Sequence, residues 1–105
     1  MDLNRIIQLL ESEKINWSQH ILKKMQKRRI KINDIMFSIK NGEINGEIIE
    51  NYPDDYPYPS CLILGYNKEK NPIHIVCAVG NDNLWMITTY YPDEEIWKDD
   101  FKNRR

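Results

Sequence analysis

The stretch CLILGYNKEKNPIHIVCAVGNDNLWMITTYY, residues 61–91, decides the fold of this chain. It contains three apolar runs, 61–66, 73–79 and 84–91, that are rich in β-branched and aromatic residues. The segments between the runs, NKEKNP and GNDN, have the composition of hairpin turns. These features predict three consecutive antiparallel strands. Because the 73–79 run is apolar on both faces except at His74, we expect it to form the central strand.

The sheet is expected to extend by one more strand on the N-terminal side. The segment EIIENY (47–52) predicts that strand, and 52–60 predicts a loop because its three prolines cannot lie within a central strand. In the last strand, the two-residue period predicts that Tyr90 and Tyr91 point to opposite faces. It places Leu84, Met86, Thr88 and Tyr90 on one face, and Trp85, Ile87, Thr89 and Tyr91 on the other.

Helical periodicity predicts helices on both sides of the strand region. Four are expected, over residues 2–13, 18–28, 32–41 and 92–101, with an extended link at 15–17. Asp2 and Ser18 are suitable N-caps for the first two, and Asn41-Gly42 is a stop signal for the third. The prediction is a single α+β domain over 1–105, with N-terminal helices on an antiparallel sheet of about four strands and a short C-terminal helix.

Charge is distributed unevenly along the chain, although the formal net charge of its 105 residues is only −1. Residues 14–31 hold seven basic residues and no acid, whereas the rest of the chain holds eight basic residues and all 16 acids. A local field of this kind favours an anionic partner even where the sum of charges is near zero.

Several function classes find no support in the sequence. It contains no glycine-rich nucleotide loop, no nucleophile elbow and no H-E-x-x-H motif. Cys61 and Cys77, with His20 and His74, lack metal-ligand spacing, so we expect buried free thiols, no metal and no cofactor. Residues 1–14 contain no apolar stretch long enough for a signal peptide or a membrane span, which predicts a cytoplasmic protein without membrane association.

The basic helix supplies the first candidate site. His20, Lys24 and Arg28 recur at four-residue intervals and therefore form a stripe along one flank. Arginine can grip two phosphate oxygens, lysine adds a compact charge, and histidine transfers a proton near neutral pH. This pattern indicates a phosphate site. The alternative is a solvated helix face, flanked by lysines that extend into solvent.

The strands supply the second set of candidates. His74 is either a satisfied core residue or, beside the small Val76 and Ala78, a ring that reaches a cavity. Tyr90, at a strand end, either packs in the core or stacks on a base and donates a hydrogen bond. The pair Asp54-Asp55 most simply supports a turn.

Four segments together resemble a bacterial and archaeal family that is classed as a domain of unknown function. They are SQHILKKMQKRRI (18–30), NGEIIENYPDDYPYPSCLILGY (45–66), NPIHIVCAV (71–79) and ITTYYPDEEIWKDDF (87–101). The family pattern, in the same order, is S-x-H-a-x-x-R-M-x-x-R-G-I, E-x-Y-P-x-D-x-P, p-l-H-v-V and T-v-Y-x-P-d-x-x-x-W. That family is grouped with the RelE/BrnT-like toxins and is often encoded beside a zinc-finger or helix-turn-helix antitoxin.

The resemblance implies an α+β fold with a curved antiparallel sheet, and a metal-free ribonuclease toxin that acts on messenger RNA. Its matching polar residues in this chain are His20, Arg28, His74, Thr88 and Tyr90. The chain departs from the pattern at two positions of the basic helix. Lys24 replaces an arginine, which keeps the charge but loses the bidentate fork. Arg29 replaces a glycine, so a left-handed helix end at that residue would cost about 1 kcal/mol.

The leading hypothesis is a metal-independent endoribonuclease toxin of a toxin–antitoxin pair, with RNA and a cognate antitoxin as partners. Attack by the RNA 2′-hydroxyl would use His20 or His74 as the base, with His20, Arg28, His74 and Tyr90 as catalytic residues. Lys24, Lys27, Arg29 and Thr88 would contact the substrate. The alternative is a non-catalytic module that docks RNA or an acidic protein through the basic helix. The hypotheses differ in whether the four catalytic candidates converge in one cleft.

Overall fold

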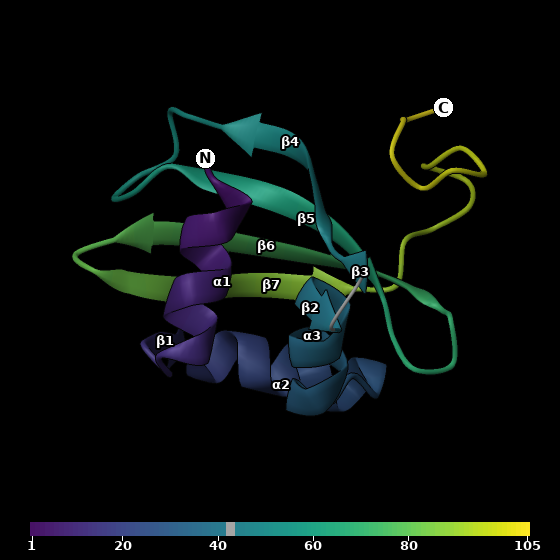
Figure 1. Ribbon diagram of the computed structural model, residues 1–105. Coiled ribbons are helices and arrows are strands. Elements are labelled where there is room, and N and C mark those ends of the chain that lie inside the picture. The colour runs from purple at the N-terminus through teal and green to yellow at the C-terminus, as the bar shows by residue number, and fades with distance from the viewer. Residues whose placement is uncertain (42–43) are drawn as a thin grey trace.

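A computed structural model describes residues 1–41 and 44–105. Within them the chain folds into three helices, a five-stranded sheet and a two-stranded ribbon (Figure 1). The helices are α1 (Leu3–Glu11), α2 (Gln19–Arg28) and α3 (Ile32–Ile39). The five-stranded sheet contains β1 (Ile15–Trp17), β4 (Glu47–Tyr52), β5 (Ser60–Tyr66), β6 (Pro72–Gly80) and β7 (Asn83–Tyr90). The ribbon pairs β2 (Lys40–Asn41) with β3 (Ile44–Asn45).

The strands of the larger sheet lie in the order β1-β7-β6-β5-β4, and the sheet is not closed. All its neighbours are antiparallel except β1, which runs parallel to β7. The predicted α+β class, the four predicted strands and the central position of β6 are therefore confirmed. The extended link at 15–17 is an additional strand, because its backbone pairs with Leu84, Trp85 and Met86.

The predicted helix ends are close to those observed. Asp2 and Ser18 cap α1 and α2, since the side-chain oxygen of each accepts a hydrogen bond from a backbone N–H of the first turn. The third helix ends at Ile39, two residues before the predicted end, and Lys40–Asn41 continues as a strand. Gly42, the second residue of the predicted stop signal, lies outside the described residues.

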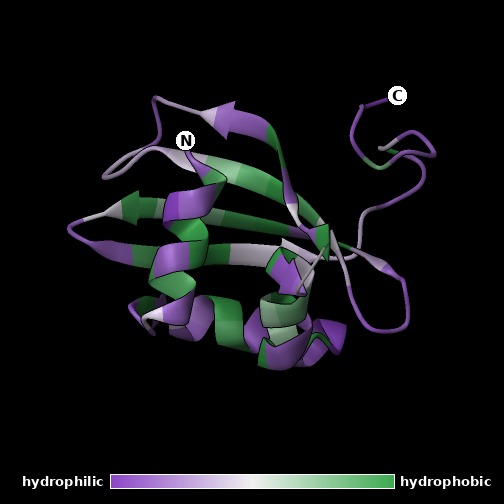
Figure 2. Ribbon diagram, in the orientation of Figure 1, coloured by the Kyte–Doolittle hydropathy of each residue, from purple (hydrophilic) through white to green (hydrophobic). Residues whose placement is uncertain are grey.

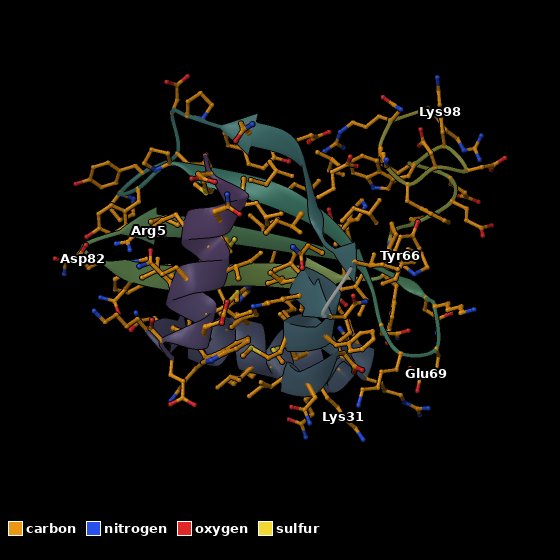
Figure 3. The ribbon with its side chains drawn as sticks, in the orientation of Figure 1. Arg5, Lys31, Tyr66, Glu69, Asp82 and Lys98 are labelled. Carbon is orange, nitrogen blue, oxygen red and sulfur yellow. The ribbon has the colours of Figure 1, made fainter. Side chains whose placement is uncertain are left out.

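One face of the sheet packs against the helices and forms the core; we call it the inner face. Ile63, Ile75 and Leu84 contribute to it from three neighbouring strands, together with buried residues of all three helices. Figure 2 shows the apolar residues concentrated along these strands and on the sides of the helices that meet them. At the rim, Arg5 of α1 pairs with Asp82 of the β6–β7 turn at 3.0 Å (Figure 3).

A β-bulge changes the alternation along β7. The pairing shifts between Cys77–Met86 and Val76–Thr88, so Ile87 is the extra residue. Leu84 and Met86 point to the inner face as predicted, but Thr88 and Tyr90 point to the opposite, outer face, where Tyr90 lies across from His74. The prediction that these four residues share one face is wrong, because a two-residue period assumes a regular strand.

The predicted C-terminal helix over 92–101 is also wrong. Residues 92–105 form turns and one isolated bridge between Trp97 and Arg104, and they fold back beside β4 (Figure 1). The Asp100 carboxylate accepts hydrogen bonds from the backbone N–H groups of Lys102 and Asn103, which offers the backbone an alternative to a helix. Phe101 adopts a left-handed conformation with φ of 58°, which ends any helical path there. None of the three described helices has the length and the apolar composition needed to cross a membrane.

Candidate functional site

The α2 stripe, defined as His20, Lys24 and Arg28, lies where α2 runs along β7. Ile21 and Met25 of the same helix are buried, which fixes the rotation of α2 and leaves His20 exposed and Lys24 and Arg28 half-buried. β1 covers only the first part of the free edge of β7. Beyond the bulge, the Arg28 guanidinium donates a hydrogen bond of 2.7 Å to the Thr89 carbonyl. The stripe therefore begins beside β1 and ends at the last residues of β7.

The exposed end of the stripe opens on a pocket of about 500 Å³, which we call the His20 pocket. Its lining combines the start of α2 with the proline-rich loop and residues of β6 and β7: Ser18, His20, Asp55, Tyr56, Pro57, Tyr58, Ala78, Trp85, Met86 and Ile87. Most of the wall is apolar or aromatic. His20 is thus the side chain of the α2 stripe that borders an open cavity.

At the other end of the stripe, the outer face carries a second group of residues, the His74 cluster: Glu50, His74, Tyr90, Trp97 and Arg104. The His74 ring is fully buried, with Trp97 packed edge-on at 4.5 Å and Tyr90 at 5.3 Å between ring centroids. His74 Nε2 lies 2.8 Å from the Phe101 carbonyl oxygen. Since a carbonyl only accepts, Nε2 carries the proton, and Nδ1 accepts from the Tyr90 hydroxyl at 3.3 Å.

A charged pair borders this ring. Arg104 grips the Glu50 carboxylate with two hydrogen bonds of 3.1 Å, and its guanidinium lies 4.5 Å from the centroid of the Trp97 ring. The Tyr52 hydroxyl donates to the same carboxylate at 2.6 Å. The C-terminal segment is thus attached to β4 through Arg104 and to β6 through the His74 hydrogen bond.

The environment sets the protonation state of each group in the His74 cluster. Burial lowers the pKa of His74, so its neutral form is favoured at pH 7. The hydrogen bonds from Arg104 lower the pKa of Glu50, which keeps that carboxylate ionised. Burial raises the pKa of Tyr90, and burial together with the Glu50 hydrogen bond raises the pKa of Tyr52 to about 12. Both tyrosines are therefore protonated donors.

The four predicted catalytic residues fall into two places. Arg28, His74 and Tyr90 lie close together, since Tyr90 contacts His74 and follows directly after the Thr89 carbonyl that Arg28 binds. His20 lies two helical turns from Arg28, about 12 Å along the axis at 1.5 Å per residue. His74 and Tyr90 lie on the outer face, whereas His20 borders its own pocket at the start of α2.

The predicted substrate contacts lie along the same border. Lys24 is half-buried between the two places, and Thr88 is half-buried on the outer face next to Val76. Lys27 and Arg29 are exposed at the end of α2. Arg29 adopts the left-handed conformation with φ of 58°, and its N–H donates to the carbonyls of Met25 and Gln26, so the arginine takes the place of a capping glycine.

Sequence reasoning missed six residues that complete these two places. Glu50, Tyr52, Trp97 and Arg104 surround His74, and Tyr58 and Trp85 line the His20 pocket. The family pattern contained a signal for three of the first group, because its E-x-Y and W positions match Glu50, Tyr52 and Trp97. The sequence offered no comparable signal for Tyr58 and Trp85. Within residues 1–41 and 44–105, no three His, Cys, Asp or Glu side chains are grouped as a metal site.

Residues 17–91 match the family model described as Domain of unknown function (DUF4258). The chain belongs to this family. No curated protein and no solved structure matches the chain. The matched range contains the α2 stripe, His74 and Tyr90, whereas Trp97 and Arg104 follow it.

Proposed function

We propose that this DUF4258 protein binds single-stranded RNA along the α2 stripe and cleaves it without a metal ion. The observation that carries the proposal is the position of the stripe. Three side chains that suit phosphate and proton transfer lie in a row along β7, and the imidazole among them, His20, borders an open pocket. Residues four apart on a helix are separated by about 6 Å along its axis, which is comparable to the separation of successive phosphates in a single strand.

The proposed reaction is attack by the ribose 2′-hydroxyl on the adjacent phosphate. His20 accepts the 2′-hydroxyl proton, the 2′-oxygen bonds to phosphorus, and the bond from phosphorus to the 5′-oxygen breaks. The leaving 5′-oxygen takes a proton from water, and the proton on His20 neutralises the resulting hydroxide. The products are a 2′,3′-cyclic phosphate and a 5′-hydroxyl. Lys24 stabilises the charge on the reacting phosphate, and Arg28 holds the next phosphate along the strand.

In this proposal His74 is a positioning residue. Both ring nitrogens are engaged and the ring is fully buried, so it has no free nitrogen with which to accept a substrate proton. Its contact with the Tyr90 hydroxyl fixes the tyrosine at the Arg28 end of the stripe. Tyr90 then orients the RNA strand beside Arg28.

We further propose that the protein is a toxin of the RelE/BrnT-like superfamily, held inactive in the cytoplasm by a cognate antitoxin. The support is the resemblance of its motifs and the exposed charge of α2. Lys23, Lys27 and Arg29 add three exposed cations to the stripe. An acidic antitoxin segment that covers this surface would neutralise it and block RNA at the same time.

Single substitutions in the stripe test the proposal. In EDTA, and at low salt where phosphate contacts are strongest, His20→Ala should lower the rate of RNA cleavage by about 10²–10⁴ and leave RNA binding nearly unchanged. Arg28→Ala should weaken binding and reduce the slope of log K against log salt by about 1. Arg5→Ala removes the same charge from α1, outside the stripe, and is the matched control. Cleavage that survives His20→Ala would contradict the catalytic assignment.

A second function is favoured by one specific observation, the occupation of His74. With that ring committed to Tyr90 and Phe101, His20 is the one histidine of the chain that is exposed to a ligand. A non-catalytic module that docks RNA does not need a second accessible histidine to act as an acid. In that case the same experiment gives salt-dependent binding that Arg28→Ala weakens, and the RNA stays intact for the wild-type protein.

A further inference from the structure

We propose that the His20 pocket is a binding site for an unpaired nucleobase of the RNA. This inference rests on the proposed binding of RNA to the α2 stripe. The stripe binds the phosphates of the RNA, and the pocket would bind one of its bases. The pocket lies at the end of the stripe where His20 is exposed, and it encloses about 500 Å³. A nucleotide whose phosphate lies on the stripe has its base within reach of this cavity.

Local contacts fix the orientation of the two aromatic rings, Tyr58 and Trp85, that form the wall of the pocket. Trp85 is half-buried, and its indole N–H donates to the Gly80 carbonyl at 3.0 Å. The one polar atom of the ring is therefore satisfied, and the ring has a fixed orientation. Tyr58 packs against it with 5.9 Å between ring centroids and an angle of 31° between the planes. Two held rings offer flat apolar surfaces, which is what base stacking requires.

The position of Tyr58 depends on a glycine. A Cβ atom at residue 80 would lie 2.1 Å from Tyr58 Cδ1, so only glycine lets this ring sit over the end of β6. The loop that carries Tyr58 is closed by a hydrogen bond from the Ser60 hydroxyl to Asp55 and by the Asp55 N–H to the Tyr52 carbonyl. Three separate local features therefore support one aromatic wall.

The residues at the mouth of the His20 pocket indicate which class of ligand it would bind. Ile87, pushed outward by the bulge, is 40% exposed, and with the two rings it forms an apolar surface in the open. Lys24 lies one helical turn beyond His20 on the same flank, so a cation follows the pocket along α2. A ligand that fits both has a flat aromatic end and an anionic end, as a nucleotide has. The base must be unpaired, because a side chain reaches only the face of a base that is splayed out of a helix.

A binding experiment with modified RNA tests this site without any protein variant. The probe is a short single-stranded RNA, 2′-O-methylated so that it cannot be cleaved, together with a series that lacks one base at a time. Loss of the base at one position should weaken binding roughly ten-fold, because stacking on an aromatic side chain contributes on that scale. Loss of the others should matter little. Equal binding of every member of the series would overturn the base site.

Protein variants then test whether the loss of affinity caused by removing one base arises in the His20 pocket. Tyr58→Leu, and separately Gly80→Ala, which keeps both rings but displaces Tyr58, should weaken binding of the intact RNA roughly ten-fold and leave the sensitive abasic RNA unaffected. Tyr66→Leu removes an exposed tyrosine from the far end of β5 and is the control (Figure 3). Urea unfolding checks that each variant is folded.

The outcomes separate this inference from the proposed function. If Arg28→Ala weakens binding but Tyr58→Leu weakens the intact and abasic RNAs equally or not at all, RNA binding stands and the base site is overturned. If the protein binds none of these RNAs at low salt, the proposed function fails and the base site fails with it.

Discussion

His20 of α2 and His74 of β6 lie in opposite surroundings. His20 is exposed at the mouth of a pocket, whereas His74 is fully buried with both nitrogens hydrogen-bonded. The family pattern marks the two residues alike. The difference teaches that two histidines matched by one family pattern can have different roles. His20 is available to a ligand, and His74 attaches the C-terminal segment to the sheet.

The largest effect is expected at the centre of the His74 cluster. Trp97 is 2% exposed and contacts both His74 and Arg104, so Trp97→Ala should lower the free energy of unfolding by about 3–5 kcal/mol. Trp85→Ala, at the half-buried tryptophan of the His20 pocket, is the comparison and should cost less. Urea unfolding followed by circular dichroism measures both. Equal losses would mean that the C-terminal segment contributes no more than the pocket wall.

The two histidines themselves give the next effect. His74→Ala should lower the free energy of unfolding by about 3 kcal/mol, because it leaves a cavity beside Trp97 and an unpaired Phe101 carbonyl. His20→Ala should change it by less than about 0.5 kcal/mol, as is usual for an exposed side chain. A large loss in the His20 variant would show that this residue also has a structural role.

Titration of His74 should give stability a pH dependence of about 1.4 kcal/mol per unit of pKa shift. Its pKa in the folded state is lowered below the ordinary value of 6.5, so the unfolded chain binds the proton more tightly. Its contribution is complete above pH 6.5, is lost as the pH falls from there, and stops changing below the folded-state pKa. Glu50, whose pKa lies below 4.5, acts at lower pH.

The same unfolding measurement, repeated between about pH 5 and pH 8, isolates the His74 contribution. His74→Gln keeps a hydrogen-bonding side chain but removes the titration, so the difference between wild type and variant should shrink as the pH falls. A difference that is constant over this range would contradict the assigned neutral ring.

A small gain in stability is expected at the end of α2. Arg29→Gly should raise the free energy of unfolding by at most about 1 kcal/mol, because glycine adopts the left-handed conformation of this residue without the Cβ penalty. The greater entropy of glycine in the unfolded chain offsets part of that gain. A thermal melt detects the change. Arg29→Ala, which loses the charge but keeps the Cβ, separates charge from conformation and should give no increase.

Local sequence signals predicted the parts of the fold that local chemistry decides. The strand over 47–52 and the Ser18 cap were predicted at the residues where they occur, because alternation and capping depend only on near neighbours. The pairing of 15–17 with β7 was not predicted, since three residues carry no periodicity. The C-terminal helix was wrongly predicted because Trp97 and Phe101 have helical spacing, whereas the segment is organised by contacts with distant β4 and β6.

The candidate site was predictable only in part, for the same reason. Helical spacing identified the α2 stripe, whose residues share a flank of one helix. The contact of His74 with Tyr90 depends on the bulge at Ile87, and the sequence of β7 contains no signal that predicts this bulge. The Tyr58–Trp85 wall joins a loop to a strand 27 positions later in the chain, and only the folded structure brings them together.

The extra residue in β7 has a consequence for the geometry of the whole outer face. Trp85 and Tyr90 are separated by an odd number of positions, and a regular strand would send their side chains in opposite directions. The bulge advances the phase of the strand by one residue, so both rings reach the same side. The single strand β7 therefore contributes an aromatic ring to both the His20 pocket and the His74 cluster. Under the proposed function, both aromatic rings are then available to RNA on one face of the sheet.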